Sequence, residues 1–323
     1  MNNFSSKLNS FYNSHVRLTT TAKKELREKR DRNERRIKNG LKEAKKSQPI
    51  KFIKQGSFKH GTLVQPPQNS ASDKYDIDEA VVFNEEDCGG PKTTRQWVAD
   101  AISSQDSNLT VEVLPRCVRV TYANGVQCDF PVMSYREGVL WGRTYELSNG
   151  SEWIETDPHH IAKWVDDKVS LSSVDSSGHY QLRKMIRLAK YFAKTQAKAH
   201  DRKALSGLAV TSLTIHGYAD HLGRDDLAFV NLLKYFSNID TSASVKADHA
   251  VISKPNDQSR LLFLKNQATA ALKKFDDGSE ENALNFIFQH TFFKKDDKDK
   301  KSLLRAGVAS LSSQDAGYKP WGE

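Results

Sequence analysis

Apolar positions in the first half of the chain recur with the spacing of β-strands. Residues 75–83 (YDIDEAVVF) alternate between polar and apolar and then become continuously apolar, as a buried strand does. Two alternating runs flank Asn124-Gly125, a pair that favours a tight hairpin turn. The other predicted elements are strands at 51–55 and 109–114 and a helix at 92–104. This mixture of strands and helices predicts an α+β fold for residues 1–150.

After Gly150 the strand patterns fade, and apolar residues recur every three or four positions, as they do in amphipathic helices. The predicted helical segments lie at 153–169, 178–200, 204–219, 226–239 and 259–275. We therefore predict two domains, an α+β core at 1–150 and a helical lobe at 151–323. The polar end of the chain, from about Lys294, is predicted to be a flexible tail.

A long helix is predicted at the N-terminus, over residues 3–38. One apolar stripe supports its first half: Phe4, Leu8, Phe11, His15 and Leu18. The helix is expected to break near Thr19–Thr21 and to end at Asn39–Gly40, because glycine commonly caps a helix C-terminus.

The second half of this helix carries most of the charge of the chain. The formal net charge is +9, and residues 23–46 hold twelve Lys or Arg against five Asp or Glu, a local net of +7. Opposite charges recur four residues apart, as in Glu25 and Lys29, and such pairs support a helix. This favours a solvated, ion-paired helix over an arm that binds nucleic acid.

Composition excludes several classes of protein. Fifteen Phe, ten Tyr and five Trp are too many for a disordered chain. No apolar run approaches a membrane span, and the N-terminus lacks the layout of a secretory signal. The three cysteines are scattered and form no CxxC pair, which favours a reducing cytoplasm over a disulfide scaffold or a cysteine-rich zinc site.

Three carboxylates in apolar strands are the candidate catalytic residues. Asp76 and Asp78 project from one face of their predicted strand, about 7 Å apart. Asp129 lies in a second strand between Cys128 and Phe130, an apolar setting for a charge. Clustered carboxylates of this kind usually hold divalent ions, and oxygen ligands without a His or Cys set suit Mg²⁺ or Mn²⁺.

Gly56-Ser57 follows the predicted strand at 51–55. A turn of this composition can present backbone N–H groups and a hydroxyl to phosphate oxygens. A Gly-Ser turn followed by Asp-x-Asp and a third Asp therefore predicts a nucleotide site.

In this arrangement GSFKHGT (56–62), YDIDEAVVF (75–83) and QCDFPV (127–132) resemble the motif of DNA-polymerase-beta-type nucleotidyltransferases. More narrowly, the chain resembles the CD-NTases of bacterial anti-phage (CBASS) systems, relatives of cyclic GMP-AMP synthase and oligoadenylate synthase. The long N-terminal helix, Trp153 with Asp157-Pro158, and a later helix support the narrower resemblance. The matching positions of that helix are Leu182, Ile186, Arg187, Leu188, Lys190 and Phe192.

The resemblance implies a catalytic core of mixed sheet and flanking helices with a C-terminal helical lobe. It implies two Mg²⁺ or Mn²⁺ ions bound by Asp76, Asp78 and Asp129, which serve as catalytic residues and metal ligands. Nucleotide contacts are implied at Gly56, Ser57, Lys190 and Ser206.

Independently, cationic residues form one stripe on the helix that contains Lys190, and such a stripe can neutralise a triphosphate. They are Arg183, Arg187, Lys190, Lys194 and Lys198.

Relatives commonly have a base-stacking aromatic residue after the serine that corresponds to Ser206, whereas this chain has Gly207, so stacking is expected from Tyr218 or Tyr191. The zinc-binding insertion of the animal DNA sensor is absent, which argues against obligatory activation by DNA.

The leading hypothesis is metal-dependent synthesis of a cyclic di- or trinucleotide from nucleoside triphosphates, with ATP and GTP as the expected substrates. A template-independent RNA nucleotidyltransferase would use the same carboxylates, and a non-catalytic nucleotide or RNA sensor is the third hypothesis. The resemblance also implies a cytoplasmic enzyme whose product activates an effector protein. It further suggests a ubiquitin-ligase-like partner at the C-terminus, near Trp321-Gly322-Glu323.

Overall fold

The computed structural model describes residues 3–68, 75–138, 142–254, 256–277 and 280–294. Its internal contacts divide the chain into two compact units. One comprises Thr19–His60 and Ala71–Lys163 and contains the large sheet; we call it the sheet unit. The other comprises Met1–Leu18, Gly61–Ser70 and Trp164–Glu323 and is mainly helical; we call it the helical unit. No helix among the described residues is long and apolar enough to cross a membrane.

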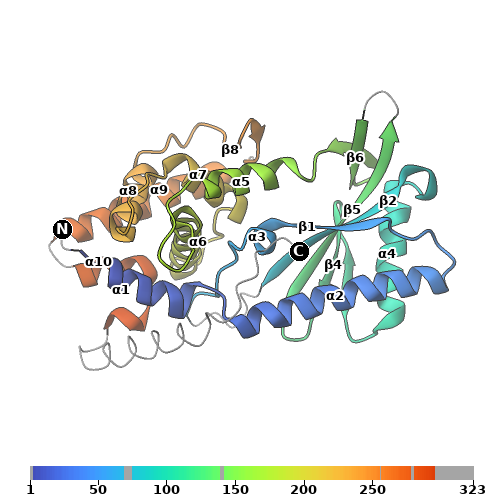
Figure 1. Cartoon of the computed structure of the whole chain (residues 1–323), viewed down its shortest axis with the longest axis horizontal. Coiled ribbons are helices and arrows are strands. Elements are labelled where there is room, and N and C mark those ends of the chain that lie inside the picture. Colours follow the sequence, from blue (N-terminus) through green and yellow to red (C-terminus); the bar gives the residue numbers. More distant parts are fainter. Residues whose placement is uncertain (1–2, 69–74, 139–141, 255, 278–279, 295–323) are drawn as a thin grey trace. The chain divides into compact units, whose positions relative to one another are not determined.

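The sheet unit is built on seven hydrogen-bonded strands (Figure 1). They are β1 (Lys51–Gln55), β2 (Asp76–Asn84), β3 (Thr110–Val113), β4 (Cys117–Thr121), β5 (Gln127–Gly138), β6 (Gly142–Asn149) and β7 (Glu152–Thr156). The main order is β1-β2-β5-β4-β3, and β6 pairs with both β5 and β7. Only the β2–β5 pair is parallel, so the sheet is mixed. The predicted α+β fold is confirmed.

Helices α2 (Thr20–Glu43) and α4 (Pro91–Gln105) accompany the sheet. The side chain of Thr19 caps α2 by accepting a hydrogen bond from the backbone N–H of Ala22. The prediction that this helix ends at Asn39–Gly40 was wrong, because α2 continues to Glu43. Gly40 serves close packing instead: a Cβ there would lie 2.3 Å from the backbone oxygen of Ala101 in α4. The α2–α4 crossing therefore requires a glycine.

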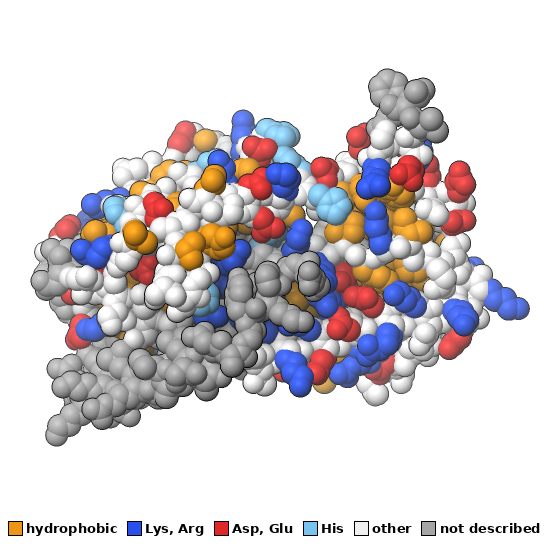
Figure 2. Space-filling model, in the orientation of Figure 1, with side chains coloured by type: hydrophobic (Ala, Val, Ile, Leu, Met, Phe, Trp, Pro, Cys, Tyr) orange, Lys and Arg blue, Asp and Glu red, His pale blue; other side chains and the backbone are white. Residues whose placement is uncertain are grey.

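Cationic side chains of α2 are engaged within the sheet unit. Glu25 pairs with Lys29 at 3.3 Å, as predicted, and Lys29 also lies over the Tyr122 ring. Arg36 pairs with Asp106 at the end of α4. In Figure 2, blue and red side chains intermingle over the region that α2 occupies in Figure 1. Glu79 and Asp106, two acids outside α2, thus neutralise part of its charge, and acids of the helix itself pair with some of the other cations.

The helical unit packs around α6 (Gln181–Ala199), whose residues are buried along nearly its whole length. Its other elements include α1 (Ser5–Phe11), the π-helical turn η1 (Tyr12–Val16), α7 (Gly207–Gly217), α8 (Asp225–Ser237), α9 (Asp257–Asp276), α10 (Glu280–Phe288) and η3 (Thr291–Lys294). Phe11, Tyr191 and Phe288 pack together in the aromatic centre of this core. The helix predicted at 3–38 is interrupted at Arg17, whose backbone is extended, close to the predicted break.

One predicted helical segment contains a strand. The segment at 153–169 begins with β7, and its helix, α5 (His160–Ser170), starts later. The reason is a tight hairpin: Asn149 pairs with Glu152 around Gly150-Ser151, which places Trp153 opposite Ser148 in β6. A short ribbon of β8 (Lys246–Ala247) and β9 (Ala250–Val251) also follows α8. The tail predicted from about Lys294 lies almost entirely outside the described residues.

Candidate functional site

The pairing of β2 with β5 brings the three predicted carboxylates together. In this parallel pair Asp78 lies opposite Asp129, and Asp76 is two residues away on the same face of β2. Their carboxylate oxygens lie within 4.8 Å of one another. Asp76 is exposed, Asp78 is half-buried and Asp129 is 8% exposed. The cluster is therefore anchored in the sheet at Asp129 and open to solvent at Asp76.

Gly56, directly after β1, lies against this cluster. Its φ of +65° is a left-handed conformation that glycine adopts readily. A Cβ at this position would lie 2.0 Å from Oδ2 of Asp78. Both the backbone conformation and the position of the Asp78 carboxylate therefore require glycine here.

Ser57 belongs to the single helical turn α3 (Gly56–Lys59), which starts where β1 ends. In β1, Gln55 pairs with Asp78 of β2, so the turn begins beside the carboxylate cluster. The structure thus brings Gly56 and Ser57 to the same end of the sheet as the three aspartates.

Arg119 of β4 is a site residue that the sequence interpretation missed. It pairs with Asp129 across the antiparallel β4–β5 ladder. Its Nε donates to Oδ1 of Asp129 at 2.7 Å, and its Nη2 donates to Oδ2 at 2.6 Å. These hydrogen bonds, followed by the negative charges of Asp129 and Asp76, raise the pKa of Arg119 above its ordinary value. Arg119 therefore keeps its positive charge beside the cluster.

Glu79 follows Asp78 in sequence but projects from the other face of β2. Its carboxylate lies 3.6 Å from Arg30 of α2 and is buried. Burial and, after it, the charge of Glu34 raise the pKa of Glu79 to about 8, and the charge of Arg30 offsets only part of this rise. Glu79 therefore contributes to the α2 side of the sheet and not to the carboxylate cluster.

The two cysteines nearest the cluster are poor nucleophiles. Burial raises the pKa of Cys117 to about 12, and the charge of Asp129 adds to this effect. Burial likewise raises the pKa of Cys128 to about 12, with a smaller contribution from Asp76. Because the thiolate is the reactive form, neither residue is suited to covalent catalysis.

Lys190 and Ser206 lie in the helical unit. Lys190 is 6% exposed, and its Nζ donates to Oγ1 of Thr62 at 3.1 Å. Ser206 is exposed and immediately precedes α7, where its hydroxyl accepts from the backbone N–H of Ala209. A Cβ at Gly207 would lie 3.7 Å from Nζ of Lys190, so Lys190 and the start of α7 are neighbours. Their predicted contact with a triphosphate stays a prediction.

The cationic stripe on α6 is less solvated than its spacing suggested. Arg187 is buried, donates from Nε to the backbone oxygen of Gly61 at 2.6 Å, and also bonds the Tyr12 hydroxyl. Arg187 and Lys190 thus fasten the segment that follows the Gly-Ser turn, at Gly61 and Thr62.

Of the two tyrosines that the sequence left open as base-stacking residues, Tyr191 is too deeply buried for that role. Its side chain has no exposed surface and packs edge-on against Phe11 in the core. Tyr218 is half-buried, and its hydroxyl donates to Gln181 at 2.9 Å. Only Tyr218 of this pair presents any surface to a ligand.

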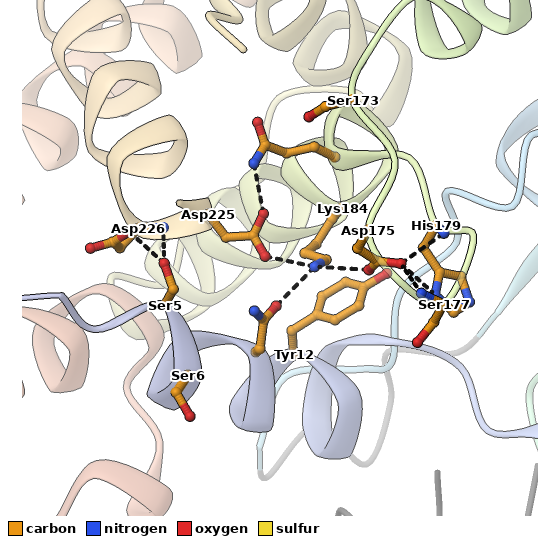
Figure 3. A network of polar contacts seen from close by, with 12 residues as sticks. Ser5, Ser6, Tyr12, Ser173, Asp175, Ser177, His179, Lys184, Asp225 and Asp226 are labelled. Carbon is orange, nitrogen blue, oxygen red and sulfur yellow. Dashed lines mark hydrogen bonds and ion pairs between the residues drawn. The ribbon is translucent and has the colours of Figure 1, made fainter. Parts of the chain in front are cut away.

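A second polar cluster lies in the helical unit (Figure 3). Lys184 of α6 pairs with Asp225 of α8 at 2.6 Å, lies 3.5 Å from Asp175, and donates to Asn9 of α1. Nearby, Asp226 accepts a 2.5 Å hydrogen bond from the hydroxyl of Ser5. These contacts join α1, α6 and α8, and we assign them a structural role.

Residues 50–133 match the family model described as the nucleotidyltransferase domain of DncV-like cyclic GMP-AMP synthases. This range contains Gly56, Ser57 and the three aspartates. The resemblance inferred from the sequence motifs is therefore confirmed for this region.

A curated cyclic GMP-AMP synthase from Escherichia albertii is 22% identical over 256 residues, which make up 75% of this chain and 56% of that protein. This chain thus spans little more than half the length of that relative.

Solved structures share the fold. One is Vibrio cholerae DncV with the linear intermediate 5′ pppA(3′,5′)pG, at a TM-score of 0.70 and 17% identity, covering 88% of this chain and 96% of that one. Another is CdnC of E. coli MS115-1 in complex with a HORMA protein, at a TM-score of 0.63 and 16% identity, with the same coverage.

Proposed function

We propose, from the DncV-like nucleotidyltransferase domain at residues 50–133, that this chain joins nucleoside triphosphates into a cyclic di- or trinucleotide and releases pyrophosphate. The observation that carries the proposal is the convergence of Asp76, Asp78 and Asp129 at the end of the β2–β5 pair. The names of the relatives, synthases of cyclic GMP-AMP, support ATP and GTP as substrates.

The donor set fits Mg²⁺ or Mn²⁺. Three carboxylates within 4.8 Å of one another offer only oxygen ligands, which these hard cations prefer. We propose that Asp76 and Asp78 bind both ions and that Asp129 binds the ion beside the attacking hydroxyl. Bound there, the ions would make a ribose hydroxyl a stronger nucleophile and stabilise the departing pyrophosphate.

The remaining groups of the site would position the substrates. In each transfer a ribose hydroxyl oxygen forms a bond to an α-phosphorus, the bond from that phosphorus to the β-phosphate oxygen breaks, and pyrophosphate leaves. Gly56 and Ser57 are proposed to contact the triphosphate, and Lys190 and Ser206 to contribute charge and hydrogen bonds to it. Such transfers depend on positioning and electrostatics, so no nucleophilic side chain is required.

Two alternatives stay open. A template-independent RNA nucleotidyltransferase would use the same aspartates but needs an RNA surface, and the cations of α2 are engaged by acids and aromatic rings of their own unit. A nucleotide sensor without activity would gain nothing from three mutually repelling carboxylates. Extension of a labelled RNA primer would support the first alternative, and nucleotide binding without turnover would support the second.

The wider setting also belongs to the proposal. We propose a cytoplasmic enzyme of an anti-phage system whose cyclic product activates a separate effector protein. The complex of CdnC with a HORMA protein supports association of this class of enzyme with a partner protein. A ubiquitin-ligase-like partner at the C-terminus stays a prediction, since residues 295–323 lie outside the described part of the chain.

The decisive experiment replaces Asp76 and Asp78 with Asn and incubates the protein with Mg²⁺ and all four nucleoside triphosphates. We expect synthesis of a phosphatase-resistant product, identified by mass spectrometry, to fall by about 1,000-fold or more, because the metal ligands are lost. Asp100→Asn, an exposed carboxylate on α4, is the matched control and should leave synthesis unchanged. Unchanged synthesis in the Asp76→Asn, Asp78→Asn double variant would refute the proposed function.

A further inference from the structure

One row of side chains crosses five strands at the carboxylate cluster. The strand registers align Gln55, Asp78, Asp129, Arg119 and Glu112. Residues opposite one another in adjacent strands project from the same face of a sheet. The cluster therefore includes a cation: Arg119 directly follows the acids Asp78 and Asp129 in the row.

The contact between Arg119 and Asp129 uses both carboxylate oxygens. Nε and Nη2 of the guanidinium each donate to a different oxygen, at 2.7 and 2.6 Å. This bidentate geometry is the strongest form of an arginine–carboxylate pair and fixes the orientation of the carboxylate. The side chain of Asp129 is 11% exposed, so an unpaired charge there would be costly. Arg119 thus compensates the buried charge of Asp129 in the protein without bound metal.

A guanidinium in this position also acts on any cation that approaches Asp129. Each carboxylate oxygen has further lone pairs, so Asp129 can still ligate an ion while Arg119 donates to it. The positive charge of Arg119 nevertheless repels that ion and competes for the same oxygens. Asp76 is exposed and lies two residues from Asp78 in β2. Because β5 lies between β2 and β4, Asp76 is one strand farther from Arg119 than Asp129 is. The electrostatic penalty therefore falls mainly on the ion that requires Asp129.

We propose that Arg119 is a positioning residue that orients Asp129 and weakens the binding of the ion that Asp129 shares, so that the two ions bind with unequal affinity. This inference rests on the proposed function, because it assumes that the three aspartates hold divalent ions. It assigns Arg119 a regulatory role at that site. The ion held mainly by Asp76 and Asp78 binds first, and the ion at Asp129 binds more weakly until a second source of negative charge, the substrate triphosphate, offsets Arg119.

The test measures the affinity of the full chain for Mn²⁺ in the absence of nucleotide. Electron paramagnetic resonance of the free ion gives the amount that is not bound. In Arg119→Gln the weaker Mn²⁺ site should bind at least about threefold more tightly, because a unit positive charge beside its ligand is removed. The same variant without metal should melt at a lower temperature, because Asp129 loses its partner. Arg116→Gln is the matched control: Arg116 is exposed, lies one residue before β4 and bonds Asn149.

A second comparison tests whether the effect of Arg119 on Mn²⁺ affinity depends on Asp129. In an Asp129→Asn background, Arg119→Gln should no longer change Mn²⁺ affinity, because the shared ligand has lost its charge. If Arg119→Gln does not fold, Arg119→Lys replaces it: lysine cannot occupy both oxygens, so the weaker site should tighten by about twofold. Unchanged or weaker Mn²⁺ binding in the folded variant would overturn the proposal. The proposed function has a separate test, since product synthesis by the Asp76 and Asp78 variants does not depend on Arg119.

Discussion

Gly56 shows how one residue outside the carboxylate set fixes the geometry of the site. Its backbone has a φ of +65°, and the position of a Cβ is already occupied by Oδ2 of Asp78. Any side chain at this position must move either the turn after β1 or the Asp78 carboxylate. The Gly-Ser turn and the Asp-x-Asp motif are therefore physically linked, and they act as one unit of the site.

This link predicts that Gly56→Ala reduces product synthesis by about 100-fold or more, because a displacement of about 1 Å in a positioned group can cost that much. The matched control is Gly150→Ala, which has a φ of +63° but no atom within 4 Å of a Cβ. Both variants carry similar backbone strain, and only Gly56→Ala disturbs Asp78. Equal synthesis by the two variants would show that the close contact with Asp78 does not matter.

At this scale the sequence predicted the acids better than the cation that accompanies them. Asp76 and Asp78 are found from strand alternation alone, and Asp129 from its apolar neighbours. Arg119 requires the register of a hairpin, which alternation does not give. That register was available, since Asn124-Gly125 is the turn and Arg119 and Asp129 are equally distant from residue 124. Lys190 and Arg187, predicted to belong to a cationic stripe, are buried, and backbone and hydroxyl oxygens of residues 61 and 62 accept their hydrogen bonds.

At the scale of elements, the attachment of α1 to α8 depends on one buried carboxylate, Asp226. It accepts hydrogen bonds from the hydroxyl of Ser5 (Figure 3), the backbone N–H of Phe4 and the guanidinium of Arg224. Burial alone would raise the pKa of Asp226, but the hydrogen bonds, that of Arg224 foremost, lower it from 3.8 to about 2. Asp226 is therefore charged at neutral pH and ties the start of α1 to α8.

Asp226→Asn should destabilise the protein at pH 7 by about 1.5–3 kcal/mol, the usual contribution of hydrogen bonds to a charged group. The folded pKa lies below the unfolded one, so the stabilisation is complete above pH 3.8 and is lost as the pH falls towards 2. The difference in free energy of unfolding between the variant and the natural protein, measured by denaturant titration, should thus shrink only below pH 3.8. Asp240→Asn, at an exposed carboxylate, is the control. A difference that stays constant down to pH 2 would contradict this account.

The sequence predicted the helices and strands whose hydrophobic pattern is local. It missed those that depend on pairing with another strand or packing against another helix. The strands β1, β2 and β3 and the helix α4 appear within a residue or two of their predicted bounds. The strand β7 was read as helix because its five residues are too few to show a period. Its hairpin partner β6 stabilises it, and Gly150-Ser151 was the overlooked turn signal. The extension of α2 past Gly40 likewise depends on α4, which no pattern within α2 reveals.

At the scale of the whole molecule, the formal net charge of +9 overstates the positive charge that is free of contacts with acids and aromatic rings. Three cations of α2, Lys29, Arg30 and Arg36, are only 11–12% exposed and pair with acids of the sheet unit. Lys38 and Lys46 lie over the rings of Phe52 and Trp97. These contacts therefore reduce the positive charge that this segment offers to a polynucleotide.

We accordingly predict that duplex DNA neither binds tightly nor stimulates synthesis. The logarithm of the DNA affinity should fall with the logarithm of salt concentration with a slope of magnitude below about 3, because few phosphates are neutralised. Fluorescence anisotropy of a labelled duplex at low and moderate salt measures this slope, and product formation with and without DNA should agree within about twofold. Arg32→Gln with Arg35→Gln, at exposed positions of α2, should leave synthesis unchanged. A steep salt dependence together with DNA-stimulated synthesis would instead make α2 a nucleic-acid surface, and its intramolecular ion pairs would then have to break on binding.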